Sequence, residues 1–155
     1  VSTRYGDVLP SSKALAGAGI EMIGMANREF LLKNALDEVA ADHKHTRFVM
    51  CHFGNPFLDC AAAVVEKNPN VSADLSGILE GRVDLDAYFR EQAGYAGLLK
   101  TWITAINAWD KLMYGTDWPI VNLGEYIGFI KGLVPEQHWE KIFFDNANRI
   151  YGLGL

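Results

Sequence analysis

The stretch that decides the fold is Leu112-Met113-Tyr114-Gly115-Thr116-Asp117-Trp118-Pro119. Its first three residues are apolar and predict a short buried strand, which Gly115 ends, while Pro119 prevents a helix from starting at once. Asp117 therefore follows the carboxyl end of a strand, where α/β proteins gather ligands and metals. Taken alone, a carboxylate in this position is more typical of a turn or a helix cap. A functional role for Asp117 needs support from the rest of the chain.

The chain has the size and composition of one globular domain. It has 155 residues, and half of them are hydrophobic, which is enough to build a sizeable core. We therefore expect residues 1–155 to form a single domain, in which residues 1–25 show no clear pattern.

Charge and hydropathy exclude several classes of partner. The formal net charge is −5 and no basic run occurs, so nucleic acid and anionic membranes are poor candidates. No apolar run approaches the ~18 residues of a membrane span. Arg4 and Asp7 interrupt the N-terminal stretch, so we do not expect it to be a signal peptide. The two cysteines, Cys51 and Cys60, do not suggest a disulfide scaffold, and we expect both to be buried reduced thiols. We therefore expect a cytoplasmic protein.

Short strands alternate with amphipathic helices along the chain. The pattern predicts strands at 47–51, 71–75 and 112–115. It predicts helices at about 26–42, 56–67, 84–107 (with a weak middle at Gly94 and Gly97), 126–133 and 135–146. This order indicates parallel βαβ units, whose right-handed crossovers place all strand carboxyl ends on one side.

Side chains of the types that bind metals are expected on that side of the sheet. His52 follows the first strand, Asp74 lies near the end of the second, and Asp117 follows the third. An imidazole and a carboxylate are suitable ligands for zinc, manganese or iron. With a metal they could generate hydroxide or orient a water for attack. Taken alone, however, His52 is more typical of a core or capping histidine than of a ligand.

Four motifs occur here in the order found in a known enzyme family. They are Cys51-His52-Phe53-Gly54-Asn55-Pro56, Asn68-Pro69-Asn70-Val71 with Ala73-Asp74-Leu75-Ser76-Gly77, Tyr114-Gly115-Thr116-Asp117-Trp118-Pro119, and Asn146-Ala147-Asn148-Arg149-Ile150-Tyr151-Gly152-Leu153. Together they resemble the carboxyl-terminal half of the amidohydrolase-2 family of metal-dependent TIM-barrel enzymes.

The resemblance implies an α/β fold made of the last three to four βα units of a (β/α)₈ barrel. The three expected strands would be the sixth, seventh and eighth. A whole barrel takes ~250 residues, so the chain would be a fragment or a half-barrel. We expect it to complete itself by association, as a homo-oligomer or with a missing amino-terminal half.

The resemblance also implies a chemistry. His52 matches a histidine that binds metal or assists catalysis, and Asp117 matches an aspartate that binds metal, activates water, or both. The implied cofactor is one divalent metal ion, with zinc favoured over manganese or iron. We expect a metal-dependent hydrolase that cleaves an amide, lactone or related carbonyl bond of a small-molecule substrate. The alternative on the same scaffold is a non-oxidative decarboxylase.

Two features of the family are missing, and they leave a third hypothesis open. The family begins with a His-any-His pair, but here only His43 and His45 have that spacing, and they follow a helix before the sixth strand. The family also often has a fifth-strand histidine, where this chain has Ser2. The visible metal set is incomplete, so the chain could instead be a binding or assembly domain without catalysis.

The remaining residues near the strand ends have expected supporting roles. Asp74 is expected to accept hydrogen bonds rather than bind metal directly. Asn55 would shape the loop after the sixth strand, and Trp118 would be a pocket wall or a packed aromatic. Asn146 and Arg149 would tie down the final helix.

Overall fold

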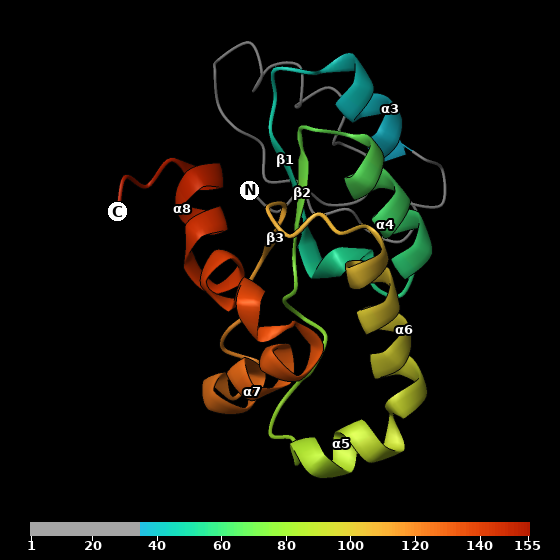
Figure 1. Cartoon of the computed structure of the whole chain (residues 1–155), viewed down its shortest axis with the longest axis vertical. Coiled ribbons are helices and arrows are strands. Elements are labelled where there is room, and N and C mark those ends of the chain that lie inside the picture. Colours follow the sequence, from blue (N-terminus) through green and yellow to red (C-terminus); the bar gives the residue numbers. More distant parts are fainter. Residues whose placement is uncertain (1–34) are drawn as a thin grey trace.

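The computed structural model describes residues 35–155, whose arrangement is shown in Figure 1. The unpatterned segment 1–25 and most of the helix expected at 26–42 lie outside these residues. The helices and strands are α3 (Ala35–Asp42), β1 (Phe48–Met50), α4 (Leu58–Lys67), β2 (Val71–Asp74), α5 (Leu85–Glu91), α6 (Ala93–Ala105), β3 (Leu112–Met113), α7 (Leu123–Leu133) and α8 (Asn146–Tyr151), with single turns η1 (Cys51–Gly54), η2 (Glu136–His138) and η3 (Lys141–Asp145).

The three strands within residues 35–155 form a parallel sheet in the order β1-β2-β3, which confirms the predicted βαβ organisation. Phe48 pairs with Val71, and Ala73 pairs with Leu112. The strands are shorter than predicted because the backbone turns away early. The N–H of Tyr114, for example, leaves the ladder and donates to the carbonyl of Ile142 at 2.7 Å.

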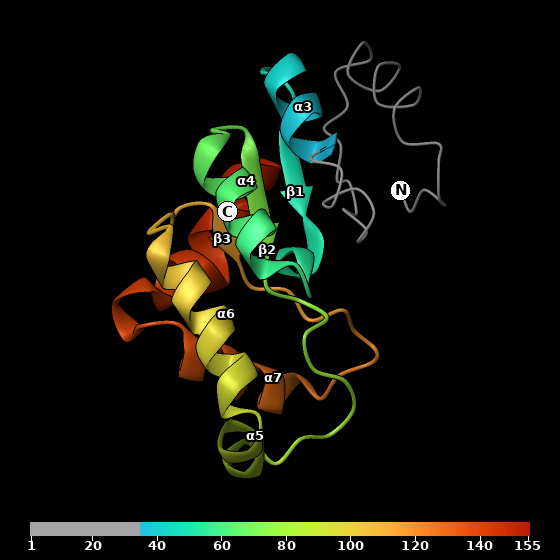
Figure 2. The same ribbon diagram turned by 90° about the vertical axis from the view of Figure 1, so that its right-hand side faces the viewer.

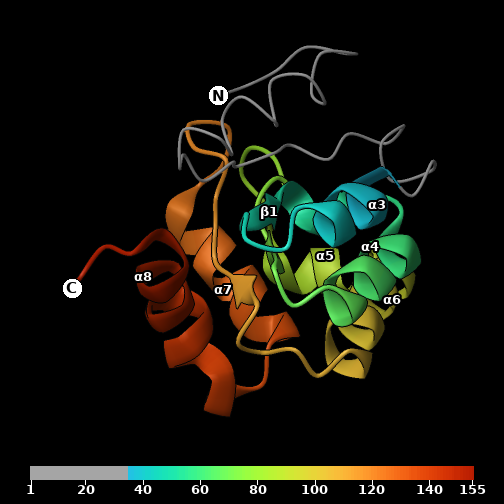
Figure 3. The same ribbon diagram turned by 90° about the horizontal axis from the view of Figure 1, so that it is seen from above.

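Helices cover both faces of the sheet. Figures 1 and 3 show α4 and α6 on one side of the strands and α8 on the other. Phe48, Met50 and Leu112 join the main core, which includes residues of α3, α4, α6 and α7. Val49 and Met113 point the other way and pack with Ile150 of α8. This is the alternation that a strand with both faces covered requires.

The long helical region breaks at Gln92, between α5 and α6, rather than at its glycines. Asp84 caps α5, because its carboxylate accepts from the N–H of Ala87 at 3.0 Å. The large apolar side chains of α6 are only partly buried. Leu99 and Ile103 are buried, but Leu98 is 49% exposed. Helix α6 packs against α4, and its buried residues Leu99 and Ile103 belong to the main core.

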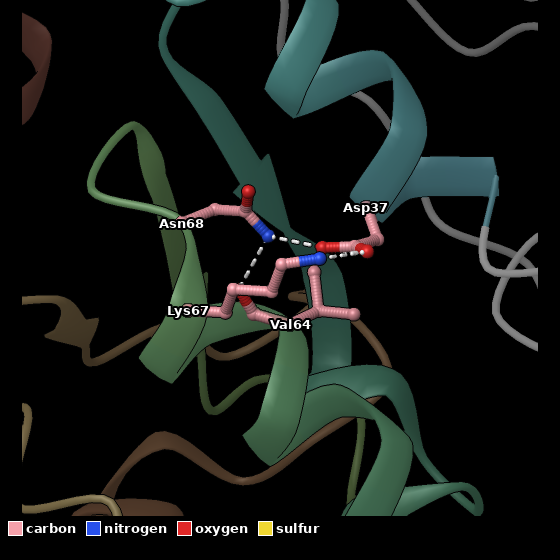
Figure 4. Close-up of polar contacts among 4 residues, drawn as sticks. All are labelled: Asp37, Val64, Lys67 and Asn68. Carbon is pink, nitrogen blue, oxygen red and sulfur yellow. Dashed lines mark hydrogen bonds and ion pairs between the residues drawn. The ribbon is translucent and has the colours of Figure 1, made fainter.

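A polar cluster ties α3 to the end of α4 (Figure 4). The Asp37 carboxylate accepts from the Lys67 ammonium at 2.6 Å and from the Asn68 amide at 2.7 Å. Asn68 also donates to the carbonyl of Val64 at 3.0 Å. The ammonium of Lys67 and the amide of Asn68 therefore share one carboxylate across two helices.

The final helix extends further than predicted, past Asn146 to Tyr151, and ends where Gly152 adopts a left-handed conformation with φ of 64°. Asn146 and Arg149 anchor it, as expected. The Asn146 amide donates to the carbonyls of Trp109 and Leu112, both at 2.7 Å. The guanidinium of Arg149 donates to the carbonyl of Asp110.

The loops after β2 and β3 run side by side (Figure 2). The N–H of Gly81 donates to the carbonyl of Ile120, and the N–H of Asn122 donates back to the carbonyl of Gly81. The segments that carry Ser76 and Asp117 are therefore joined beyond the sheet. Across residues 35–155, no helix combines the length and the apolar character that a bilayer crossing requires.

Candidate functional site

His52 lies directly after β1, in the turn η1, and its backbone is unusual. Its φ of 60° is left-handed, and the next residue, Phe53, has a φ of 45°. Non-glycine residues rarely adopt this conformation. Such outliers are concentrated at functional sites, where the surrounding structure holds them in place. The half-buried His52 side chain is therefore fixed by an uncommon turn.

One oxygen of Asp74 organises this turn. Its Oδ1 accepts from the N–H of His52 at 3.0 Å, from the N–H of Ser76 at 3.0 Å and from the Ser76 hydroxyl at 2.5 Å. The Ser76 Oγ lies 2.9 Å from Nδ1 of the His52 ring. Asp74 therefore accepts hydrogen bonds at the ends of both β1 and β2.

The backbone of Gly77 lies directly against the His52 ring. A Cβ atom placed on Gly77 would lie only 2.2 Å from Nδ1 and 2.5 Å from Cε1 of that ring, and Gly77 has a φ of 61°. Buried Tyr126 of α7 holds the same turn, because its hydroxyl donates to the carbonyl of Leu75 at 2.6 Å and accepts from the N–H of Ile78 at 3.2 Å.

Sequence reasoning placed Ser76 and Gly77 at the end of a strand but did not include them in the site. The spacing between Asp74 and Ser76 could have indicated the role of Ser76. A serine two residues after an aspartate can return its hydroxyl and its N–H to that carboxylate, as Ser76 does with Asp74.

Asp117 follows β3 and also has a left-handed backbone, with a φ of 59°. Its side chain is exposed and has no hydrogen bond or ion pair among the described residues. Close packing joins the end of β3 to the end of β2, because a Cβ on Gly115 would lie 3.0 Å from the Cβ of Ser76 and 3.5 Å from that of Asp74. Asp117 is thus an exposed carboxylate that follows a strand on the same side of the sheet as His52.

Cys51, the first residue of η1, is not a thiolate at neutral pH. Burial raises the pKa of its thiol to about 12, with further contributions from the nearby Asp74 and the charge of Asp117. Both acidic side chains therefore act electrostatically on one thiol. Cys51 and Cys60 are free, as expected, but both are half-buried rather than buried.

The other residues predicted for this region have definite places. The Asn55 side chain accepts from the Tyr95 hydroxyl of α6 at 2.8 Å, so it ties the turn after β1 to that helix. Trp118 is 70% exposed, which contradicts the expectation of a packed aromatic. His43 and His45 precede β1 and lie at its amino end, away from the turn of His52.

The donor types present here suit a divalent metal, but the set is partial. His52 and Asp117 supply an imidazole and a carboxylate, whereas catalytic zinc sites generally use three protein ligands. Within residues 35–155, no group of three or more His, Cys, Asp or Glu side chains is arranged to hold an ion. Further ligands for such an ion would have to come from outside the described residues.

Comparison with known proteins identifies the family and the fold. A family model described as Amidohydrolase matches residues 24–153. No curated protein matches the sequence.

Several solved structures share the fold. An amidohydrolase from Burkholderia multivorans with bound zinc has 18% identity and a TM-score of 0.69, with coverage of 95% of this chain and 57% of that chain. A TIM-barrel protein from Bordetella bronchiseptica has 22% identity and a TM-score of 0.65, with coverage of 94% and 50%. A dihydroxybenzoic acid decarboxylase from Polaromonas sp. JS666, with bound manganese and the inhibitor 2-nitroresorcinol, has 15% identity and a TM-score of 0.57, with coverage of 83% and 40%. This chain therefore spans about half of their length, and its parallel sheet is part of a TIM barrel.

Proposed function

We propose that this chain, which belongs to the amidohydrolase family, takes part in metal-dependent hydrolysis of an amide, lactone or related carbonyl bond in a small molecule. The observation that carries the proposal is the pair of left-handed residues, His52 and Asp117, which follow two strands of one parallel sheet. Each presents a group able to bind metal or move a proton.

The proposed metal is one divalent ion held by His52, Asp117 and ligands from outside the described residues. Zinc is favoured, with manganese and iron as alternatives; zinc and manganese are each present in one of the similar structures. Such an ion polarises a carbonyl group and lowers the pKa of a bound water.

The residues of this chain would then have distinct tasks. The exposed Asp117 carboxylate would accept a proton from the attacking water and pass it to the leaving group. His52 would offer its ring nitrogen Nε2, because Nδ1 faces Ser76. Asp74, whose Oδ1 is occupied by three donors, would hold the turn rather than bind the substrate.

A second candidate reaction is non-oxidative decarboxylation on the same residues. It is supported by the shared fold with the Polaromonas decarboxylase. A third candidate, a binding or assembly domain, remains if the metal ligands are never completed.

A substrate screen separates these reactions. The chain would be supplied with zinc or manganese and tested on amides, lactones and aromatic carboxylic acids, with carbon dioxide release measured alongside bond cleavage. Cleavage without carbon dioxide supports the hydrolase. Asp117→Asn should lower the rate by about 10²–10⁴-fold, since that is the contribution of a positioned general base. An unchanged rate in this variant would contradict the proposed role.

We also propose that the sheet is completed by association with a second copy or with an amino-terminal half-barrel. Among the described residues, β1 and β3 each pair with one neighbour only. A chain that sediments as a 17.2 kDa monomer at every concentration would contradict the homo-oligomer.

The free state of Cys51 and Cys60 supports a reducing compartment such as the cytoplasm.

A further inference from the structure

The contact between Ser76 and His52 determines which nitrogen of the imidazole ring carries the proton. A neutral imidazole has one N–H and one lone pair, and the partner of one nitrogen decides the state of the other. Here Nδ1 of His52 faces the Ser76 Oγ at 2.9 Å. Among the described residues, Nε2 has no hydrogen-bond partner.

The hydroxyl group of Ser76 donates its proton to Asp74. An ionised carboxylate only accepts hydrogen bonds, and Asp74 Oδ1 lies 2.5 Å from the Ser76 Oγ. This is the short distance of a hydroxyl that donates to a charged oxygen. The N–H groups of His52 and Ser76 point at the same oxygen, which stabilises its negative charge.

Ser76 therefore offers only lone pairs to the ring. A hydrogen bond between its Oγ and Nδ1 forms only if Nδ1 brings the proton. With the proton on Nε2 instead, two lone pairs would face each other at 2.9 Å.

The ring has little room to avoid this contact. The backbone of Gly77 packs against the Nδ1 and Cε1 edge. The phenol of Tyr126 fixes the turn from Leu75 to Ile78 that carries both Ser76 and Gly77. A rotated ring would lose its only side-chain hydrogen bond within the described residues.

We propose that Ser76 is a positioning residue, oriented by Asp74, which keeps the proton of neutral His52 on Nδ1 and leaves the lone pair on Nε2. The importance of this tautomer rests on the proposed function, because Nε2 is then the atom offered to a metal or a proton. Histidines that bind metals commonly donate the other ring N–H to an acceptor group. In this chain a serine hydroxyl would be that acceptor, with a carboxylate behind it.

Nitrogen-15 NMR of the imidazole rings tests the proposal on the 155-residue chain without added metal, at a pH where the rings are neutral. The chain has four histidines, and the spectrum of His52→Asn identifies the signal of His52. The expected wild-type result is a proton on Nδ1. A wild-type ring protonated on Nε2 would overturn the proposal, whatever any variant does.

Three variants test the role of the hydroxyl. Ser76→Ala should shift the tautomer ratio toward Nε2–H by about five- to tenfold, which is the effect of losing one hydrogen bond. Ser76→Thr keeps the hydroxyl and should keep the wild-type ratio. Ser72→Ala removes a hydroxyl from β2, on the same segment as Ser76, and should leave the tautomer ratio unchanged. An unchanged ratio in folded Ser76→Ala would contradict the role of Ser76.

The same samples separate this proposal from the proposed function. If His52 carries its proton on Nδ1 but zinc added afterwards leaves its signals unmoved, the tautomer stands and the metal proposal fails. If zinc binds while the metal-free ring is protonated on Nε2, the positioning role fails and the metal proposal stands.

Discussion

Gly77 and His52 are in direct contact, with no space between the glycine backbone and the imidazole for even a methyl group. A Cβ on Gly77 would lie 2.2 Å from Nδ1 of His52. The ring position of His52, which follows β1, is therefore set by the backbone of Gly77, three residues after Asp74 at the end of β2. Only glycine satisfies both this contact and the φ of 61°.

Gly77→Ala should be markedly destabilising, and Gly81→Ala is its matched control. Both glycines have positive φ, but a Cβ on Gly81 would meet nothing within 4 Å. Gly81→Ala should therefore lower the free energy of unfolding by only the backbone penalty, about 1–2 kcal/mol. Gly77→Ala should exceed that loss by at least about 1 kcal/mol, because the ring must move. Denaturant unfolding measures both, and equal losses would contradict the contact.

Tyr126→Phe should destabilise the turn that carries Ser76. The change leaves the Leu75 carbonyl and the Ile78 N–H without their shared partner inside the protein. We expect a loss of about 1–3 kcal/mol in the free energy of unfolding. Tyr88→Phe is the control, because Tyr88 contacts Phe129 in the same aromatic group and its hydroxyl has no hydrogen bond among the described residues. A loss as large in Tyr88→Phe would show that packing, not the hydroxyl, is responsible.

The link between α3 and α4 should depend on pH. Hydrogen bonds from Lys67 and Asn68 hold the pKa of Asp37 below its ordinary value of 3.8. Since the folded pKa is lower than the unfolded one, the stabilisation is present above pH 3.8 and is lost as the pH falls through the folded pKa. Lys67 is 65% exposed, so Asp37→Asn should lower the unfolding free energy by only about 0.5–1 kcal/mol at pH 7.

Unfolding of wild type and Asp37→Asn at pH 7 and near pH 2 checks this link. The difference in unfolding free energy between wild type and Asp37→Asn should be smaller near pH 2 than at pH 7, and smaller in high salt. Asp42 lies on the same helix, and its side chain has no hydrogen bond among the described residues. Asp42→Asn should therefore show no such pH dependence. A difference that grows on acidification would contradict the assigned cause.

The sequence predicted the parallel sheet because buried strands and amphipathic helices alternate in it. It also predicted that His52 and Asp117 follow their strands, and that Asp74 lies near the end of its strand, on one side of the sheet, since that depends on chain order alone. Asp74 confirms the expectation of an acceptor, with three hydrogen bonds to one oxygen.

The contacts of the site needed the structure. No periodic pattern indicates that Gly77 supports the ring of His52, or that Tyr126, 50 positions further along the chain than Ser76, holds the same turn. The left-handed backbones of His52 and Asp117 were equally hidden, because histidine and aspartate adopt such conformations only where surrounding contacts impose them. The exposure of Leu98 and Trp118 likewise depends on which elements pack beside them.

Metal binding by wild type and Asp117→Asn tests the central proposal most directly. Asparagine tolerates the left-handed backbone of Asp117, so this variant removes the charge and keeps the shape. Calorimetric titration with zinc should give one site per wild-type chain. Loss of a group that only hydrogen-bonds to a metal ligand typically lowers metal affinity by about 10–100-fold. Because Asp117 is proposed to bind the metal directly, the zinc affinity of Asp117→Asn should fall by more than that. Asp110→Asn, which removes one charge at the amino end of β3, should bind as wild type does. No zinc binding by the wild type, or equal affinity in Asp117→Asn, would contradict the account.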